Sequence, residues 1–264
     1  WIYIYYYSVE VNIIFIRLYL LGLIIFCIFS LFFTYLSRLV SLRLYTVSSV
    51  YSLTETIIEI TLQPKTRKKM NFLPGQYCYM HIHSQGLDTP HPFSIASPPG
   101  PEKIIILAES KDNYTYQLRT LKPDTKVYIE GPYGSFSYRF SRNKRQIWIG
   151  EGIGITPFIS MAKDLRNPDY YIDLFYIASD SNRMAYLSEL VLAEARFSHI
   201  KIYPYQSSLY GNFSASKLLQ YSKYIYNTDI FLCADSDTTV NLLREFKTIG
   251  IKSKHVHIQK PLPV

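Results

Sequence analysis

The chain has 264 residues, a formal net charge of +8 and three cysteines. Its basic residues are scattered rather than gathered into an arm or stripe, which argues against a nucleic-acid-binding protein. Cys27, Cys78 and Cys233 lie far apart without C-x-x-C spacing, which argues against a disulfide framework or a structural zinc site and is typical of a reducing compartment. The length is sufficient for two domains with separate cores.

The first predicted element is a membrane helix. Leu18–Leu36 is a run of nineteen residues without a charged side chain, which is long enough to cross a bilayer. Arg17 precedes the run and Arg38 and Arg43 follow it, so the charges slightly favour a cytoplasmic location for the rest of the chain. A buried helix of a soluble domain is the alternative, and a signal peptide fits poorly. Because the sequence begins at Trp1, we expect a fragment of a longer protein.

Short strands and turns follow from Thr46 to about Arg139. Their apolar runs are separated by Pro, Gly and Asp, a pattern typical of a small antiparallel β-barrel. Residues 115–121 are predicted to form one short helix, and the basic run at 65–69 a solvated hairpin loop. The strand candidates are 56–62, 75–83, 91–97, 103–108 and 126–130.

From Gln146 onward, predicted strands alternate with predicted helices. This alternation indicates an α/β domain with a doubly wound parallel sheet, whose ligands bind at the carboxyl ends of the strands. The predicted domains are a membrane segment (1–43), a barrel (44–140) and an α/β domain (141–264). The strand candidates are 147–149, 171–177, 200–203 and 230–233, and the helix candidates are 157–166, 183–196, 214–222 and 237–248.

A glycine-rich turn follows the first strand of the α/β domain. It contains Gly150, Gly152 and Gly154 and leads into Thr156 and Pro157. We predict Thr156 as the N-cap of a helix and Pro157 in its first turn. Free backbone N–H groups and the positive end of the helix dipole would then face an anion such as a phosphate. A tight turn with a purely structural role is the alternative.

Four motifs occur in one order along the chain: Pro-Gly-Gln-Tyr at 74–77, His-Pro-Phe-Ser at 91–94, Gly-Pro-Tyr-Gly at 131–134 and the glycine turn at 150–157. Taken alone, residues 91–94 could be an ordinary edge strand. The ordered set resembles the ferredoxin–NADP reductase superfamily, and most closely its ferric reductase/NADPH oxidase branch. That branch also places a transmembrane helix directly before the flavin-binding barrel, as the predicted helix at 18–36 would be here.

The resemblance implies a membrane-anchored flavin enzyme. FAD would bind to the barrel and NADPH or NADH to the α/β domain, and electrons would pass to haem, ferric iron, oxygen or a redox protein. The implied partners are therefore NAD(P)H, the lipid bilayer and this acceptor, with no nucleic acid. A single span would leave both cofactor domains on the cytoplasmic side. Haem is expected only if upstream membrane helices exist outside this chain, because none of its six histidines lies in the membrane segment.

The resemblance also implies site residues. Ser94, near the flavin N5, and Cys233, beside the nicotinamide, would be catalytic, although a plain buried cysteine is the alternative for Cys233. Phe93 would lie against the flavin ring, and Thr115 would hold the pyrophosphate through its hydroxyl and backbone N–H. No metal ligands are implied. The implied cofactor-binding residues are His91, Pro92, Phe93, Ser94, Thr115, Gly131, Gly150, Gly152, Gly154 and Thr156, with Ser179 and Arg183 as candidates for a 2′-phosphate.

The chain departs from the family pattern at four places. Residues 109–115 lack the usual Lys and Gly, Cys233 is followed by Ala-Asp rather than Gly-Pro, the C-terminal aromatic residue is missing, and Ser179 follows the second α/β strand where an arginine is common. Two other functions therefore stay open: a reductase that feeds a separate oxygenase or carrier, and a non-catalytic module with the same fold. The histidine pairs 81/83 and 255/257 are each expected to share one strand face, as solvent-facing or hydrogen-bonded strand residues rather than metal ligands.

Overall fold

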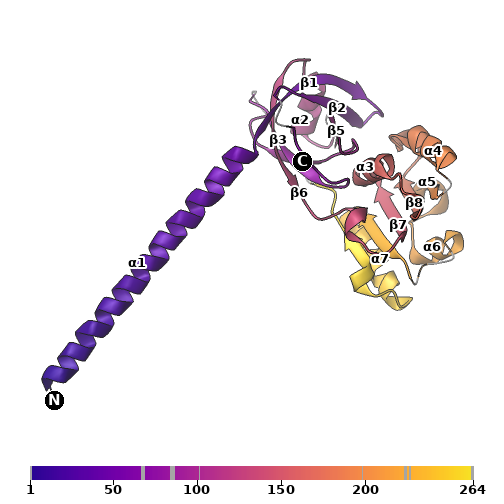
Figure 1. Cartoon of the computed structure of the whole chain (residues 1–264). Coiled ribbons are helices and arrows are strands. Elements are labelled where there is room, and N and C mark those ends of the chain that lie inside the picture. Colours follow the sequence, from indigo (N-terminus) through magenta and orange to yellow (C-terminus); the bar gives the residue numbers. More distant parts are fainter. Residues whose placement is uncertain are drawn as a thin grey trace. The chain divides into compact units, whose positions relative to one another are not determined.

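The computed structural model describes residues 2–66, 69–83, 87–100, 102–197, 199–222, 225 and 227–262 (Figure 1). Two residues of the predicted basic loop, Arg67 and Lys68, lie outside this set. The chain divides into two compact units, Trp1–Leu42 and Arg43–Val264, and each is described by itself.

Helix α1 (Ile2–Ser41) makes up the first unit. It is longer than the predicted helix at 18–36. Within it, Ile13–Leu36 has 24 residues, a mean hydropathy of 2.6 and no buried residue. At 1.5 Å per residue this segment spans about 36 Å, against about 30 Å for the hydrocarbon core of a bilayer. Length and composition therefore suit a membrane-crossing helix, and the large apolar side chains are exposed, including Phe26 (68%) and Leu31 (72%).

The second unit begins with an antiparallel sheet in the strand order β4-β3-β6-β1-β2-β5. Its two edges meet at a bridge between Ile95 and Ile106, where Ala96 N–H donates to the carbonyl of Ile105 at 2.7 Å. The sheet therefore curls into the predicted barrel. Its elements are β1 (Arg43–Ser52), β2 (Ile57–Pro64), β3 (Tyr77–His81), β4 (His91–Ser94), β5 (Ile104–Glu109), α2 (Asn113–Gln117) and β6 (Lys126–Tyr133).

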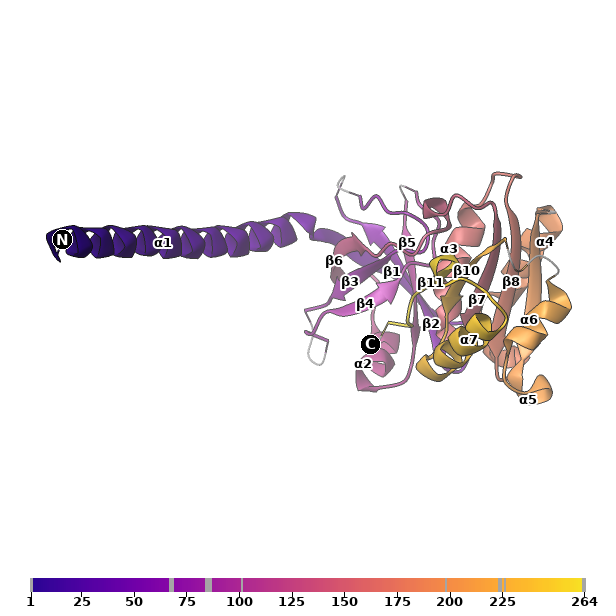
Figure 2. The same cartoon turned by 90° about the horizontal axis from the view of Figure 1, so that it is seen from below.

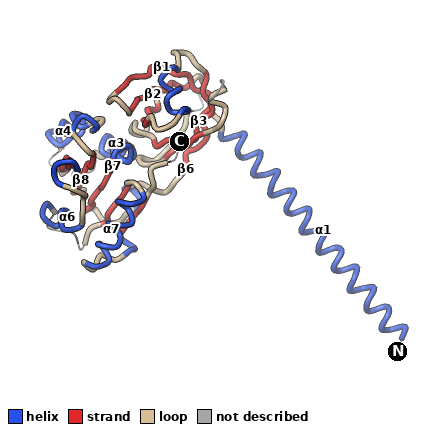
Figure 3. Tube along the Cα trace, turned by 180° about the vertical axis from the view of Figure 1, so that it is seen from behind, coloured by secondary structure: helices blue, strands red, loops and turns tan. Residues whose placement is uncertain are grey.

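A five-stranded parallel sheet follows, in the order β11-β10-β7-β8-β9. One apolar cluster packs α3 and α4 on one face, and another packs α6 and α7 on the other (Figure 2, Figure 3). The sheet is therefore doubly wound, as predicted. Its elements are β7 (Arg145–Glu151), α3 (Thr156–Asp164), β8 (Tyr171–Ala178), α4 (Leu187–Arg196), β9 (Ile200–Gln206), α5 (Ser207–Tyr210), α6 (Ala215–Tyr221), β10 (Asp229–Cys233), α7 (Ser236–Thr248) and β11 (Val256–Ile258).

The barrel and the parallel sheet share one apolar core. Ile57 and Leu107 of the barrel belong to the same buried cluster as Trp148 of β7 and Phe158 of α3. The hydroxyl of Ser160 also donates to the carbonyl of Ser97 at 2.7 Å, and both residues are buried. The predicted boundary at 140/141 thus falls between β6 and β7, inside one compact unit. This shared core holds the carboxyl ends of the parallel strands against the barrel.

Candidate functional site

A cavity of about 230 Å³ lies where β4 and β5 of the barrel meet the carboxyl ends of β7 and β10. Open α/β sheets bind ligands at this end of their strands. The volume is below the range of about 300–1,000 Å³ that encloses a whole drug-sized ligand, so only part of a large ligand can enter. The lining residues are Pro92, Phe93, Ser94, Leu107, Ala108, Glu109, Lys111, Thr115, Ile153, Gly154, Thr156, Cys233, Pro261 and Leu262.

The cavity brings together seven of the predicted site residues. Among the described residues, six others do not line it: His91, Gly131, Gly150, Gly152, Ser179 and Arg183. Sequence reasoning missed the cavity positions of Lys111, Pro261 and Leu262. The predicted residues that line it are Pro92, Phe93, Ser94, Thr115, Gly154, Thr156 and Cys233.

Strand β4 turns Phe93 into the barrel. Phe93 pairs with Cys78 of β3, and both side chains belong to the barrel core. Only 2% of Phe93 is exposed. Because side chains alternate along a strand, Pro92 and Ser94 share the opposite face, and both are half-buried. Phe93 therefore reaches the cavity from within the core, and its contact with a flavin ring stays a prediction.

The C-terminal segment closes the cavity beside Ser94. Gln259 Nε2 donates to Ser94 Oγ at 3.2 Å. The backbone N–H of Gln259 donates to the carbonyl of Leu232 at 2.9 Å, which extends the pairing of β11 with β10. Pro261 and Leu262 then line the cavity. Aliphatic side chains thus lie in the C-terminal segment, from which the family's terminal aromatic residue is missing.

The start of α2 is occupied by an internal carboxylate. The backbone N–H and the hydroxyl of Thr115 each donate to Asp112 Oδ1 at 2.8 Å. Both groups that were predicted to hold a pyrophosphate are therefore already bonded. Hydrogen bonds from Thr115 are the main reason that the pKa of Asp112 lies below its ordinary value. Asp112 is thus a carboxylate at neutral pH, next to the position expected for a phosphate group.

His91 packs against Tyr114 of α2, with ring centroids 3.8 Å apart. Burial lowers the pKa of His91, and the nearby Asp112 partly offsets this effect, so the neutral imidazole is favoured. The Tyr114 hydroxyl is buried and has no hydrogen-bond partner among the described residues. A buried unpaired hydroxyl is unfavourable, and a polar group of a bound ligand would satisfy it.

The glycine turn differs from its prediction at Thr156. A 3-10 turn, Gly152–Ile155, precedes α3, so Ile155 is the N-cap and Thr156 is already helical. The Thr156 hydroxyl donates to the carbonyl of Ile153 at 2.7 Å instead of accepting from an N–H group. The prediction of Thr156 as N-cap is therefore wrong, because the helical winding starts one turn earlier. Pro157 does lie in the first turn of α3.

The three glycines of the turn have different roles. A Cβ atom on Gly154 would lie 2.2 Å from the carbonyl oxygen of Cys233, and one on Gly150 would lie 3.0 Å from atoms of Ile155 and Phe158. These two glycines are required by packing. Gly152 has a φ of +54°, and a Cβ atom there would meet nothing within 4 Å. Of the three, Gly152 alone has open space in the direction of an added side chain, whereas Gly154 is the one that lines the cavity.

Cys233 ends β10 and is 1% exposed. Burial raises the pKa of its thiol to about 12, so Cys233 is a neutral thiol at neutral pH. The nucleophile and the strong metal ligand is the thiolate. Cys233 therefore contributes a small apolar wall to the cavity rather than a reactive sulfur.

The candidates for a 2′-phosphate follow β8 and both contact Asp180. Ser179 Oγ donates to Asp180 Oδ2 at 2.9 Å, and Arg183 Nε lies 3.6 Å from the same oxygen. The sequence prediction did not include Asp180. Its carboxylate occupies both groups and would repel a second anion.

Comparison with known proteins agrees with this geometry. Residues 42–137 match the family described as "FAD-binding domain". A heavy chain of the superoxide-generating NADPH oxidase of Dictyostelium discoideum is 30% identical over 131 residues, which cover 42% of this chain and 19% of that relative. Ferric reduction oxidase 5 of Arabidopsis thaliana is 31% identical over 102 residues, 36% of this chain and 14% of that relative. These similarities support the ferric reductase/NADPH oxidase branch, whose members this chain resembles.

Solved structures of this superfamily share the fold of the second unit. The flavohem-like FAD/NAD-binding domain of nitric oxide dioxygenase from Vibrio cholerae superposes with a TM-score of 0.73 at 16% identity, over 84% of this chain and 99% of that one. Ferredoxin–NADP⁺ reductase from Plasmodium falciparum gives a TM-score of 0.68 at 18% identity, over 83% of this chain and 96% of that one. The chain spans less than a fifth of the length of the two branch relatives named above.

Proposed function

We propose that the chain is a flavin-dependent NAD(P)H oxidoreductase that passes electrons from NAD(P)H through FAD to haem, ferric iron or oxygen. One observation carries this proposal. A single cavity is lined by Pro92 and Ser94 from the barrel and by Gly154, Thr156 and Cys233 from the parallel sheet. Transfer between two bound rings requires both rings in contact within one site shielded from water.

The residues present fit the ring of FAD and its immediate surroundings. The unpaired Tyr114 hydroxyl is buried beside the strand that carries the site, and Lys111 at the cavity wall forms an ion pair with Glu109, at 2.8 Å. When bound, FAD would take up two electrons from a reduced nicotinamide and release them one at a time. Ser94 would offer its hydroxyl to the ring, while Leu107, Ile153 and other apolar lining residues would exclude water.

The membrane arrangement is part of the proposal. Helix α1 would be a single span, with the barrel (44–140) and the α/β domain (141–264) on the cytoplasmic side. The exposed apolar surface of Ile13–Leu36 supports the span, and Arg38 and Arg43 after it support the orientation. The acceptor belongs to the same proposal, and a separate oxygenase or electron carrier is an alternative acceptor for electrons from a flavin bound in this cavity.

The test of function is the flavin spectrum of the full chain purified in detergent micelles. We expect the protein to bind added FAD with a flavin absorption band, and NADH to bleach that band in the absence of oxygen. NADH should bleach it faster than NADPH, because Asp180 occupies Ser179 and Arg183. Protein that stays colourless with added FAD would contradict the proposal.

A matched variant separates nucleotide binding from flavin binding. Asparagine tolerates a positive φ better than most residues, so Gly152→Asn places a side chain in the open space at limited strain. FAD content should be unchanged, while the NADH concentration needed for half-maximal bleaching should rise. Loss of FAD instead would assign Gly152 to the flavin side.

A non-catalytic module remains the second candidate, and Asp112 favours it. This carboxylate, bonded to Thr115, would repel the FAD pyrophosphate. Asp112→Ser keeps an N-cap acceptor and removes the charge. We expect the FAD dissociation constant to fall by about fivefold, because Asp112 is exposed and one like-charge contact at about 4 Å in water amounts to about 1 kcal/mol.

Titration of each variant with FAD measures this effect, and Asp169→Ser is the control. Asp169 is exposed in the loop before β8, so the control makes the same change in net charge away from the cavity. An equal gain in both variants would mean that net charge, and not Asp112 itself, limits FAD binding.

A further inference from the structure

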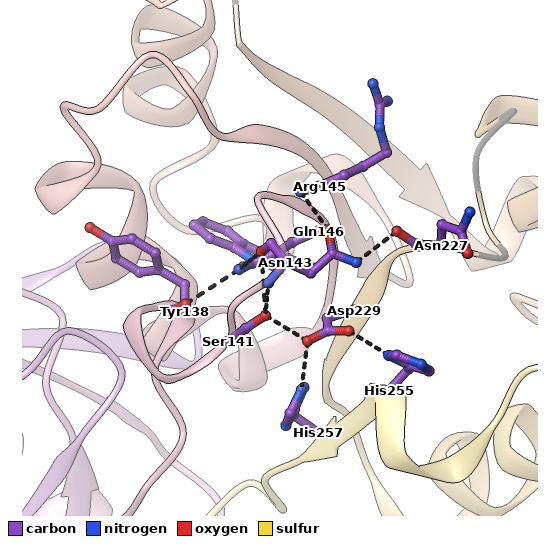
Figure 4. Close-up of polar contacts among 10 residues, drawn as sticks. Tyr138, Ser141, Asn143, Arg145, Gln146, Asn227, Asp229, His255 and His257 are labelled. Carbon is purple, nitrogen blue, oxygen red and sulfur yellow. Dashed lines mark hydrogen bonds and ion pairs between the residues drawn. The ribbon is translucent and has the colours of Figure 1, made fainter.

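A buried carboxylate joins three segments at the amino end of β10, opposite to the cavity. Asp229 is 8% exposed. Its Oδ2 accepts from Ser141 Oγ at 2.5 Å, its Oδ1 lies 2.8 Å from His255 Nδ1, and its Oδ2 lies 3.2 Å from His257 Nε2 (Figure 4). We call Ser141, Asp229, His255 and His257 the Asp229 clasp.

Hydrogen bonds to the carboxylate dominate the clasp. Burial by itself would raise the pKa of Asp229, but the bonds from Ser141, His255 and His257 outweigh burial and hold this pKa below its ordinary value. Asp229 is therefore a carboxylate at neutral pH. Hydrogen bonds to charged groups are among the stronger ones in proteins, so the clasp is a firm connection between the loop before β7, the start of β10 and the C-terminal segment.

The clasp holds an element that has little other support. Strand β11 has three residues and pairs only with β10 among the described strands. Its central residue, His257, also stacks on Phe231 of β10, with ring centroids 4.5 Å apart and an interplanar angle of 21°. Backbone pairing with β10 alone gives so short an edge strand little stability. The contacts of His257 with Asp229 and Phe231 add to the stability of β11.

The segment after β11 leads directly to the cavity. Gln259, two residues after His257, donates to Ser94 Oγ, and Pro261 and Leu262 line the cavity. No residue of the clasp lines the cavity. Any effect of the clasp on the cavity must therefore pass through β11 and residues 259–262.

We infer that Asp229 is a positioning residue, which acts on the cavity by fixing β11 and hence the contact between Gln259 and Ser94. Its significance for catalysis rests on the proposed function, but the positioning itself does not require a bound flavin. The inference assigns the clasp a role in placing one wall of the reacting site.

Asp173 provides a matched control at the same end of the sheet. It lies on β8, pairs with Ile147 in the sheet register and accepts from Ser222 Oγ at 2.9 Å. Burial raises the pKa of Asp173, so it is a second carboxylate in a partly buried site with a serine partner. These contacts do not reach β11. Other charged groups at this end are Arg145 on β7 and Lys201 on β9.

The first experiment is hydrogen–deuterium exchange of the full chain in detergent micelles without flavin. In Asp229→Ala, we expect amides of residues 256–262 to exchange about tenfold faster, the effect of losing one or more hydrogen bonds to a charged group. Asp173→Ala should leave this segment unchanged. Equal acceleration in both variants, or none in Asp229→Ala, would overturn the inference.

A second pair of variants avoids the buried position. His255 and His257 are 34% and 38% exposed, so a double replacement, His255→Ala with His257→Phe, should fold while losing both bonds to Asp229. The phenylalanine keeps a ring for stacking on Phe231. We expect the same faster exchange, and partial rescue in the His255→Gln/His257→Phe double variant, because glutamine restores an N–H donor to Asp229 while both variants keep the ring that stacks on Phe231. Equally fast exchange in the two variants would contradict a role for the bond from residue 255.

The third measurement links the clasp to the site. In FAD-loaded protein, Asp229→Ala should shift the flavin absorption band and lower the rate of bleaching at saturating NADH by about tenfold, whereas Asp173→Ala should do neither. An unchanged band and rate in Asp229→Ala would show that the wall does not depend on the clasp. If no variant and no wild-type protein binds FAD, the proposed function fails while the exchange result still decides the positioning.

Discussion

Replacing Phe93 with alanine is expected to lower the free energy of unfolding by about 3–5 kcal/mol, the usual result of removing a large buried aromatic side chain. Phe93 is 2% exposed and belongs to the barrel core with Cys78. The family resemblance places Phe93 against the flavin ring, a position from which its loss would reduce flavin binding. Because Phe93 is buried in the barrel core, its replacement should reduce the stability of the folded chain as well as any flavin binding.

Chemical unfolding of the flavin-free chain in detergent micelles measures this effect. Phe140→Ala is a suitable control, because Phe140 is 59% exposed and its truncation should change the free energy by less than about 0.5 kcal/mol. If Phe93→Ala kept the stability of wild type but lost FAD, Phe93 would be a stacking residue after all.

Gly154→Ala is expected to disrupt both the fold and the site. The added Cβ would lie 2.2 Å from the carbonyl oxygen of Cys233, and this contact can be relieved only if backbone moves. Overpacking of this kind costs about 1–3 kcal/mol or more. Because Gly154 and Cys233 both line the cavity, the same movement should slow bleaching of bound FAD by NADH.

Gly100→Ala is the matched control for this variant. Gly100 has no positive φ, and a Cβ atom there would meet nothing within 4 Å, so stability and bleaching should both match wild type. The paired measurements are chemical unfolding and anaerobic bleaching. A stable Gly154→Ala protein with normal bleaching would mean that the turn between β7 and α3 is more adaptable than its packing indicates.

The fold could be predicted from the sequence where the hydrophobic pattern was long and unbroken. The run at 18–36 predicted α1, and the alternation after Gln146 predicted the doubly wound sheet. Strand β11 was expected only as a strand face shared by His255 and His257, and its three residues, Val256–Ile258, are fixed by pairing with β10, which is a tertiary contact. Helix α5, with four residues, is likewise too short for a periodic signal.

The sequence predicted which residues belong to the candidate site better than it predicted how their side chains are arranged. Ser94, Gly154 and Cys233 do meet in one cavity. The orientation of Phe93 depends on which face of β4 packs inward, and a four-residue strand does not reveal this. The hydrogen bonds of Thr115 depend on the carboxylate of Asp112, a residue that replaces the usual glycine of the family pattern. Sequence patterns predict neighbours along the chain, whereas these errors arose from contacts that only the folded chain defines.

The burial of Cys78 and Cys233, two of the three cysteines, has a consequence for how these thiols could respond to oxidants. Cys78 and Cys233 are buried, and burial raises the pKa of each thiol to about 12. Oxidation to sulfenic acid requires an accessible thiolate, and neither residue offers one at neutral pH. Should reactive oxygen species form beside the cavity, neither of these two cysteines would therefore act as a thiolate sensor at neutral pH.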